Sequence, residues 1–151
     1  MFRYALCPVF IIISGLLAST NDPCDRITRT SANDTVDYSP ATGGVTVSLS
    51  ISGAQATGGT GFDELIGIEN ILGSAFGDIL QGNSSNNFIN DAAGIGTFSY
   101  ANAINIVKID LSITTAQNTI NAGADTLLNI ENLIGSNFAD SVCSVALRYC
   151  R

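Results

Sequence analysis

Residues 58–83 read GGTGFDELIGIENILGSAFGDILQGN, and this stretch decides the fold class. Its first nine residues match the pattern G-G-x-G-x-D-x-U-x, in which U is an apolar residue and is here Leu65. Further nine-residue registers follow between residues 73 and 99, and each keeps an apolar residue at its eighth position: Leu80, Ile89 and Phe98. No long run keeps the period of 3.6 residues that a helix requires. The stretch therefore predicts short strands separated by tight turns.

The chain contains this kind of unit twice. Residues 35–78 align without gaps on residues 97–140, at a constant offset of 62, and 20 of the 44 positions are identical. The identity stops after residue 140. Inside the copies, apolar and polar residues alternate over 45–51 and 107–113, which is typical of half-buried strands. The sequence therefore predicts an all-β chain built from two copies of a 62-residue unit, the second of them truncated.

The composition excludes several kinds of chemistry. The 151 residues include no histidine, which rules out Ser-His-Asp and Cys-His nucleophiles and zinc sites that need imidazole. The net charge is −7, and residues 30–142 hold eleven acidic residues against the single base Lys108. A segment so acidic repels phosphate backbones and anionic membrane surfaces, so we expect no nucleic-acid partner. The acids either keep the chain soluble or need a cation before the chain can compact.

The nonapeptide at residues 58–66 has the chemistry of a calcium loop. Glycines allow positive φ angles and bring backbone carbonyl groups close to an ion, and Asp63 adds an anionic oxygen. Calcium binds six to eight oxygen ligands and tolerates irregular geometry. The paired acids Asp63 and Glu64 also allow a glycosidase to be considered, but no second carboxylate is placed at the required distance. We therefore do not expect an enzyme.

Segments 64–83 and 126–140 resemble those that interrupt the nonapeptide runs of the repeats-in-toxin (RTX) family, the hemolysin-type calcium-binding repeats, and similar stretches precede the repeats of serralysin-type metalloproteases. The resemblance covers about residues 30–142. It implies a parallel β-roll or β-solenoid of degenerate nonapeptide repeats, with Ca²⁺ between stacked loops. Carried over by position, the implied metal ligands are Gly58, Gly59, Gly61, Asp63, Gly77, Asp78, Gly123, Asp125 and Asp140.

The chain departs from this family in two ways. No two consecutive nonapeptides are complete, so the implied sites are partial. The family usually leaves the cell by a C-terminal export signal, whereas residues 1–20 here have the pattern of a secretory signal peptide, with an uncleaved anchor or an artefactual start as the alternatives. A frameshifted or truncated reading frame would explain both ends. The four cysteines, all outside the repeated middle, either stay unpaired or include a disulfide between the last two: Cys7, Cys24, Cys143 and Cys150.

These observations predict a leader at 1–20, a linker at 21–33, a first RTX-like unit at 34–96, a truncated second unit at 97–142 and an irregular tail at 143–151. The first functional hypothesis is a non-catalytic, extracellular calcium-binding module of a secreted bacterial protein. Its folding would be coupled to calcium, it would have no membrane span once the leader is removed, and other domains of a larger protein are possible partners. The alternative is a structural or adhesive β-solenoid that folds without metal.

Two sets of duplicated residues receive structural rather than ligand roles. The pairs Glu69-Asn70 and Glu131-Asn132 are expected to shape the turns, with asparagine side chains bonding neighbouring backbone. Tyr38 and Tyr100 occupy equivalent positions and are expected to pack in the core.

Overall fold

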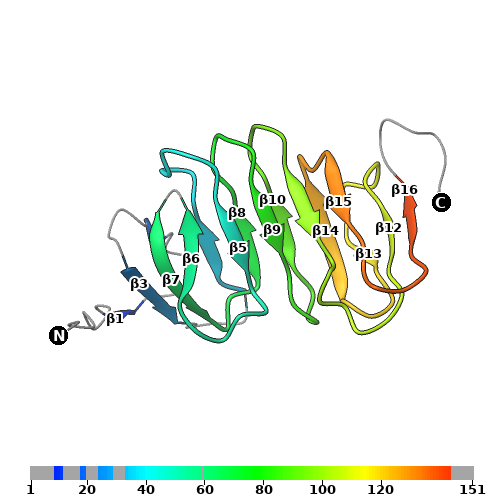
Figure 1. Cartoon of the computed structure of the whole chain (residues 1–151), viewed down its shortest axis with the longest axis horizontal. Coiled ribbons are helices and arrows are strands. Elements are labelled where there is room, and N and C mark those ends of the chain that lie inside the picture. Colours follow the sequence, from blue (N-terminus) through cyan, green and yellow to red (C-terminus); the bar gives the residue numbers. More distant parts are fainter. Residues whose placement is uncertain (1–8, 12–17, 20–23, 29–32, 59, 144–151) are drawn as a thin grey trace.

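The computed structural model describes residues 9–11, 18–19, 24–28, 33–58 and 60–143. These residues form strands, turns and bends and contain no helix, so the all-β prediction is confirmed for them. The strands lie side by side along the long axis of the molecule (Figure 1). Their bounds are β1 Val9–Ile11, β2 Ala18–Ser19, β3 Cys24–Thr28, β4 Thr35–Asp37, β5 Thr46–Ser48, β6 Gln55–Gly58, β7 Gly61–Ile66, β8 Asn70–Leu72, β9 Ile79–Gln81, β10 Phe88–Asn90, β11 Thr97–Ser99, β12 Lys108–Asp110, β13 Gln117–Asn118, β14 Ala124–Leu128, β15 Asn132–Ile134 and β16 Ser141–Cys143.

The described strands form four sheets, none of which closes on itself. Their orders are β1-β3-β7-β6, β13-β14-β10-β8-β4-β2, β15-β11-β9-β5 and β12-β16. Pairing between the strands is parallel except in two places, where β6 pairs antiparallel with β7 and β13 pairs antiparallel with β14. Val45 and Gly58 form an isolated antiparallel bridge outside the strand pairs. These two hairpins occupy equivalent positions in the two sequence copies.

Some of the strand registers follow the nine-residue spacing of the sequence. Asn70 of β8 pairs with Phe88 of β10, and Ile79 of β9 pairs with Thr97 of β11, so these two steps span 18 residues or two nonapeptides. Steps with a hairpin between the paired residues are longer: Thr35–Asn70 spans 35 residues and Thr46–Ile79 spans 33. The duplication is also visible in the pairing. Adding 62 to both members of the Thr35–Asn70 pair gives Thr97–Asn132, which is the observed pair between β11 and β15.

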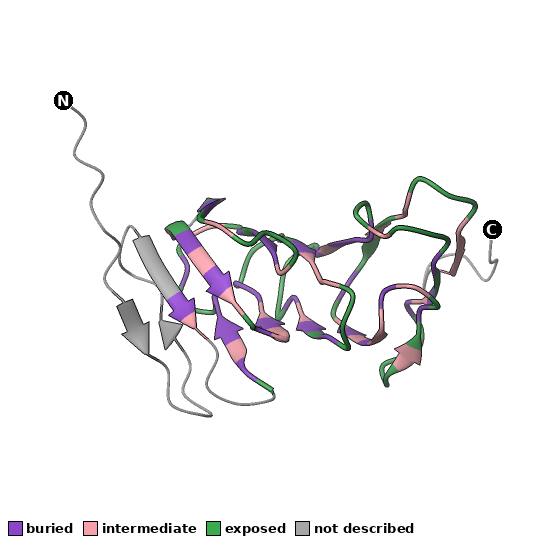
Figure 2. Ribbon diagram, turned by 90° about the horizontal axis from the view of Figure 1, so that it is seen from below, coloured by how far each residue is buried: buried purple, intermediate pink, exposed green. Residues whose placement is uncertain are grey.

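The core is built from the predicted apolar positions. Leu80, Ile89 and Phe98, the eighth residues of successive nonapeptides, have no exposed surface. Their strand neighbours Ile79 and Phe88 are exposed, because successive side chains of a strand point to opposite faces. Figure 2 shows that buried segments recur along the strand array rather than at one place.

The predicted strands at 45–51 and 107–113 are shorter than expected. In the first copy only Thr46–Ser48 is a strand, and Ile51 is exposed. The Gln55 side chain explains the early end, because its amide accepts a hydrogen bond from the Ser48 N–H at 2.7 Å and donates one to the Ser48 carbonyl at 2.9 Å. A side chain here takes the place of a pairing strand. Gln117 binds Asp110 in the same way in the second copy, at 2.8 and 3.0 Å.

The predicted leader, linker and tail fall largely outside the described residues. Cys143, at the end of β16, is disulfide-bonded. Among the described residues, none belongs to a helix that could cross a membrane.

Candidate functional site

The structure describes eight of the nine predicted ligand residues and distributes them over separate turns and strands. Gly58, Gly61 and Asp63 belong to the β6–β7 hairpin, whereas Gly59 lies outside the described residues. Gly77 and Asp78 end the turn between β8 and β9, Gly123 and Asp125 lie at the start of β14, and Asp140 precedes β16. Within the described part of the chain, no three acidic or thiol side chains gather in a way that could hold a metal ion.

The expected ion loop at residues 58–63 is a hairpin in the structure. Gly58 and Gly61 have φ angles of 80° and 104° and pair with each other across the turn. Their positive φ angles meet the expectation for glycine, but they reverse the chain into an antiparallel pair. The nonapeptide pattern predicts the positions of the glycines and the aspartate, but it does not predict whether the next strand runs parallel or antiparallel.

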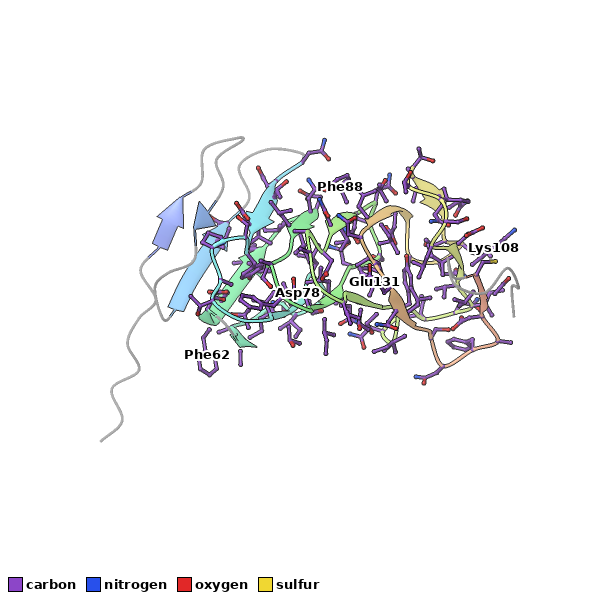
Figure 3. All side chains as sticks on the ribbon, turned by 90° about the horizontal axis from the view of Figure 1, so that it is seen from above. Phe62, Asp78, Phe88, Lys108 and Glu131 are labelled. Atoms are coloured by element: carbon purple, nitrogen blue, oxygen red, sulfur yellow. The ribbon has the colours of Figure 1, made fainter. Side chains whose placement is uncertain are left out.

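Asp78 is held by hydrogen-bond donors from two turns. Its Oδ2 accepts from the Ser74 N–H at 2.6 Å, and its Oδ1 accepts from the Ser74 hydroxyl at 2.6 Å and from the Val45 N–H at 2.9 Å. Asp78 is 1% exposed and lies in the middle of the array, whereas Phe62 and Phe88 project from its outer sides (Figure 3). The carboxylate therefore closes its own turn and connects it to the turn that ends at Val45.

Asp140 repeats this arrangement in the second copy. It accepts from the N–H and hydroxyl of Ser136, both at 2.6 Å, and from the Val107 N–H at 2.8 Å. Burial opposes ionisation of Asp140, but these hydrogen bonds outweigh it and lower the pKa of the carboxyl group. Both aspartates thus bind backbone and hydroxyl hydrogens of the chain itself.

Each of these turns needs a glycine opposite its aspartate or asparagine. A Cβ atom on Gly73 would clash with the Asp78 carboxylate, and one on Gly135 would clash with Asp140. In the turn at residues 91–96 the two positions are exchanged, since Asp91 comes first and a Cβ on Gly96 would clash with the Asp91 carboxyl group. The side chains of the first and sixth residues of such a turn would occupy the same space, so only one of the two positions can have a side chain and the other is glycine.

Asp63 and Asp125 are each paired with a buried tyrosine. The Tyr38 hydroxyl donates to Asp63 Oδ2 at 3.1 Å, and the Tyr100 hydroxyl donates to Asp125 Oδ2 at 2.9 Å. Both tyrosines are buried, as expected of packing residues. Their bonds to the aspartates were not predicted from the sequence, although the spacing of 25 residues is the same in both copies.

The surroundings of Asp63 and Asp125 differ. Asp63 Oδ2 also accepts from the hydroxyls of Thr57 and Thr60, at 3.0 and 3.3 Å, while its buried Oδ1 has no hydrogen-bond partner among the described residues. Asp125 Oδ1 accepts from the Asn87 N–H at 3.0 Å. Burial raises the pKa of Asp125 to about 6, against the opposing effect of the Asn87 and Tyr100 hydrogen bonds.

The duplicated glutamates bind neighbouring backbone. Glu69 Oε2 accepts from the Asp34 N–H at 3.0 Å, and Glu131 Oε2 accepts from the Gly96 N–H at 2.7 Å. Asn70 Oδ1 accepts from the Phe88 N–H at 3.2 Å. The expectation that these residues shape the turns is confirmed for Glu69, Asn70 and Glu131 by these bonds.

Asp91 is the acidic residue that sequence reasoning missed. It is completely buried, and neither carboxyl oxygen makes a well-formed hydrogen bond with a described residue, although the backbone and side chain of Asp78 lie close enough to interact with it. Burial, together with the negative charges of Asp78 and Glu131, raises its pKa to about 7. The sequence does contain a signal for it. In the nonapeptide at residues 91–99, Asp occupies the first position and Gly the sixth, which is the reverse of the usual pattern.

Comparisons of this chain with protein-family models, with curated proteins and with solved structures found no match.

Proposed function

We propose that this chain is a non-catalytic structural segment of a secreted protein, a β-solenoid that folds without metal. The observation that carries the proposal is the bonding of Asp78, whose carboxylate accepts three hydrogen bonds from two turns. The two 18-residue steps, from β8 to β10 and from β9 to β11, support the solenoid, since two nonapeptides fit in each of these steps. The resemblance to RTX repeats and the leader-like residues 1–20 support an extracellular location.

The donors around Asp78 and Asp140 explain why metal is not needed. Each carboxylate faces N–H and O–H hydrogens, which stabilise its negative charge as a cation would. A calcium ion at the same oxygens would have to displace these donors and leave buried N–H groups unpaired, which costs free energy. In this proposal the acidic residues act as internal ties between turns, as in the metal-independent alternative of the sequence analysis.

Unfolding of the full chain with and without calcium tests the proposal. Far-UV circular dichroism and thermal melts would be recorded in chelator and in ~10 mM calcium, a concentration that saturates weak extracellular sites. We expect the same strand content and the same midpoint in both, because the ties between turns are hydrogen bonds. Strand signal that appears only with calcium would overturn the proposal.

A second candidate, calcium-coupled folding, is favoured by one observation. Asp63 Oδ1 and both oxygens of Asp91 are buried without a well-formed hydrogen bond to a described residue, and a cation would satisfy them. Under this candidate, calcium raises the melting midpoint of the native chain, and Asp91→Asn abolishes the rise. Asp140→Asn, which changes a carboxylate already bound by three donors, is the matched control and would keep the rise.

A further inference from the structure

A groove of about 650 Å³ opens beside the turn between β9 and β10. Four segments line it, from within residues 49–50, 81–85, 99–104 and 121–122. None of the lining residues is charged, although the surrounding chain is strongly acidic. The segments come from both sequence copies, so the groove lies where the first copy meets the second.

Two amide side chains of the groove are fixed against each other. Gln81 Oε1 accepts from the Ser48 hydroxyl at 2.8 Å and from Asn102 Nδ2 at 3.2 Å. These bonds use the carbonyl end of Gln81 and the amino end of Asn102. Among the described residues, Gln81 Nε2 and Asn102 Oδ1 have no partner, so the pair offers a donor and an acceptor.

Two further amides are fixed in the same manner. Asn83 Oδ1 accepts from the Ser85 N–H at 2.8 Å and from Asn87 Nδ2 at 3.3 Å, which leaves Asn83 Nδ2 as a donor. Asn121 Nδ2 donates to the Ile106 carbonyl at 3.1 Å, which leaves Asn121 Oδ1 as an acceptor. Groups already held by the protein lose little conformational entropy when a ligand binds.

The chemistry of the lining selects the class of ligand. The acidic surroundings disfavour an anion, and a lining without carboxylates offers a cation no opposite charge. The hydroxyl groups of a ligand can both donate and accept hydrogen bonds, so they match the amide donors and acceptors that line this groove. Leu49, Ala103 and Ile104 provide apolar contact. Ile104 is 85% exposed, more than any other large apolar residue among the described residues. We propose that this groove binds a neutral oligosaccharide.

The test is a titration of the ¹⁵N-labelled full chain, followed by NMR, with cellotetraose, maltotetraose and chitotetraose as probes. We expect saturable shifts of the Gln81 and Asn83 side-chain amide signals with at least one of them, and none with tetragalacturonate. The proposal is overturned if no neutral probe causes saturable shifts at ~20 mM, above the weak millimolar range. It is equally overturned if tetragalacturonate or a Gly-Ser peptide binds more tightly than every neutral probe.

A matched pair of variants locates the site. Ile104→Ser removes an exposed apolar side chain from the groove and should weaken binding by roughly fivefold or more, as truncation of a contributing contact does. Ile95→Ser makes the same change at a residue that is 68% exposed and does not line the groove, so it should leave binding unchanged. Equal effects of the two variants would contradict binding in the groove. The outcome is independent of whether calcium stabilises the chain.

Discussion

The two sequence copies use the same ties in different surroundings. Asp78 and Asp140 accept hydrogen bonds from equivalent serines and valines, with almost equal distances. Asp78 is nevertheless buried, whereas Asp140 is partly exposed. The Asp78 turn has a described turn on each side, since its backbone also accepts from the Thr97 N–H. The same local bonding is therefore buried in one copy and partly exposed in the other, depending on the turns beside it.

Removing each of the two carboxylates should give the largest difference between the two copies. Asp78→Ala would leave three donors unpaired in a buried site, and we expect a loss of about 3 kcal/mol in the free energy of unfolding. Asp140→Ala leaves equivalent donors where water has access, and we expect a loss of about 1 kcal/mol. Urea unfolding followed by circular dichroism measures both values. Equal losses would show that burial by neighbouring turns does not set the strength of the tie.

The second prediction concerns pH, because burial acts on Asp91 and Asp125. Their pKa values in the folded chain are about 7 and about 6, above the ordinary value of 3.8. Between pH 4 and 7 the folded chain therefore binds more protons than the unfolded chain, and the free energy of unfolding falls as pH rises. We expect a loss of several kcal/mol over this range, since the Asp91 pKa lies about 3 units and the Asp125 pKa about 2 units above the ordinary value, and one pKa unit corresponds to about 1.4 kcal/mol.

Variants assign this pH dependence. Asp91→Asn mimics the protonated carboxyl group and should flatten the decrease between pH 4 and 7, and Asp125→Asn should flatten it less, up to about pH 6. Thermal melts across this range in chelator measure the slope. A slope unchanged in Asp91→Asn would contradict the assignment to that residue.

Several features of the fold could be predicted because they depend on local pattern. The apolar eighth positions Leu80, Ile89 and Phe98 are buried, and the offset of 62 in the sequence reappears in the strand registers. Period-two alternation placed β5 and β12 at the right positions but not their ends. Those ends depend on glutamines seven residues farther along the chain, and alternation contains no information about them.

The candidate site was less predictable because its partners come from distant segments. Asp63 is bound by Tyr38 from 25 residues away, and Asp78 by Val45 from 33 residues away. A nonapeptide pattern identifies the aspartate but not the groups that donate hydrogen bonds to its carboxylate. It also cannot distinguish an ion loop from the antiparallel hairpin at Gly58 and Gly61.

A third prediction concerns backbone strain at equivalent positions of the two hairpins. Gly58 has a φ of 80°, and Ile120 at the equivalent position has a φ of 78°, a conformation that is strained for a β-branched residue. Ile120→Gly should therefore raise the free energy of unfolding by about 1 kcal/mol, and Gly58→Ala should lower it by about the same amount. Urea unfolding checks both. If Ile120→Gly were destabilising, the second hairpin would not carry the backbone strain inferred from its φ angle.

The smallest expected effect separates the two tyrosine–aspartate pairs. Tyr38→Phe leaves Asp63 Oδ2 with the hydroxyls of Thr57 and Thr60, whereas Tyr100→Phe removes the donor bonded to Asp125 Oδ2. We expect Tyr100→Phe to cost about 0.5 kcal/mol more than Tyr38→Phe, the lower range of a hydrogen bond's contribution.

The same substitution has a pH signature that simple loss of packing would not produce. The Tyr100 hydroxyl lowers the pKa of Asp125, so Tyr100→Phe should raise that pKa further and extend the fall in stability to higher pH. Tyr38→Phe is the matched control, and melts from pH 4 to 8 compare the two variants. Parallel stability curves for both would mean that the tyrosines act through packing alone, and that the hydroxyl does not favour the charged form of Asp125.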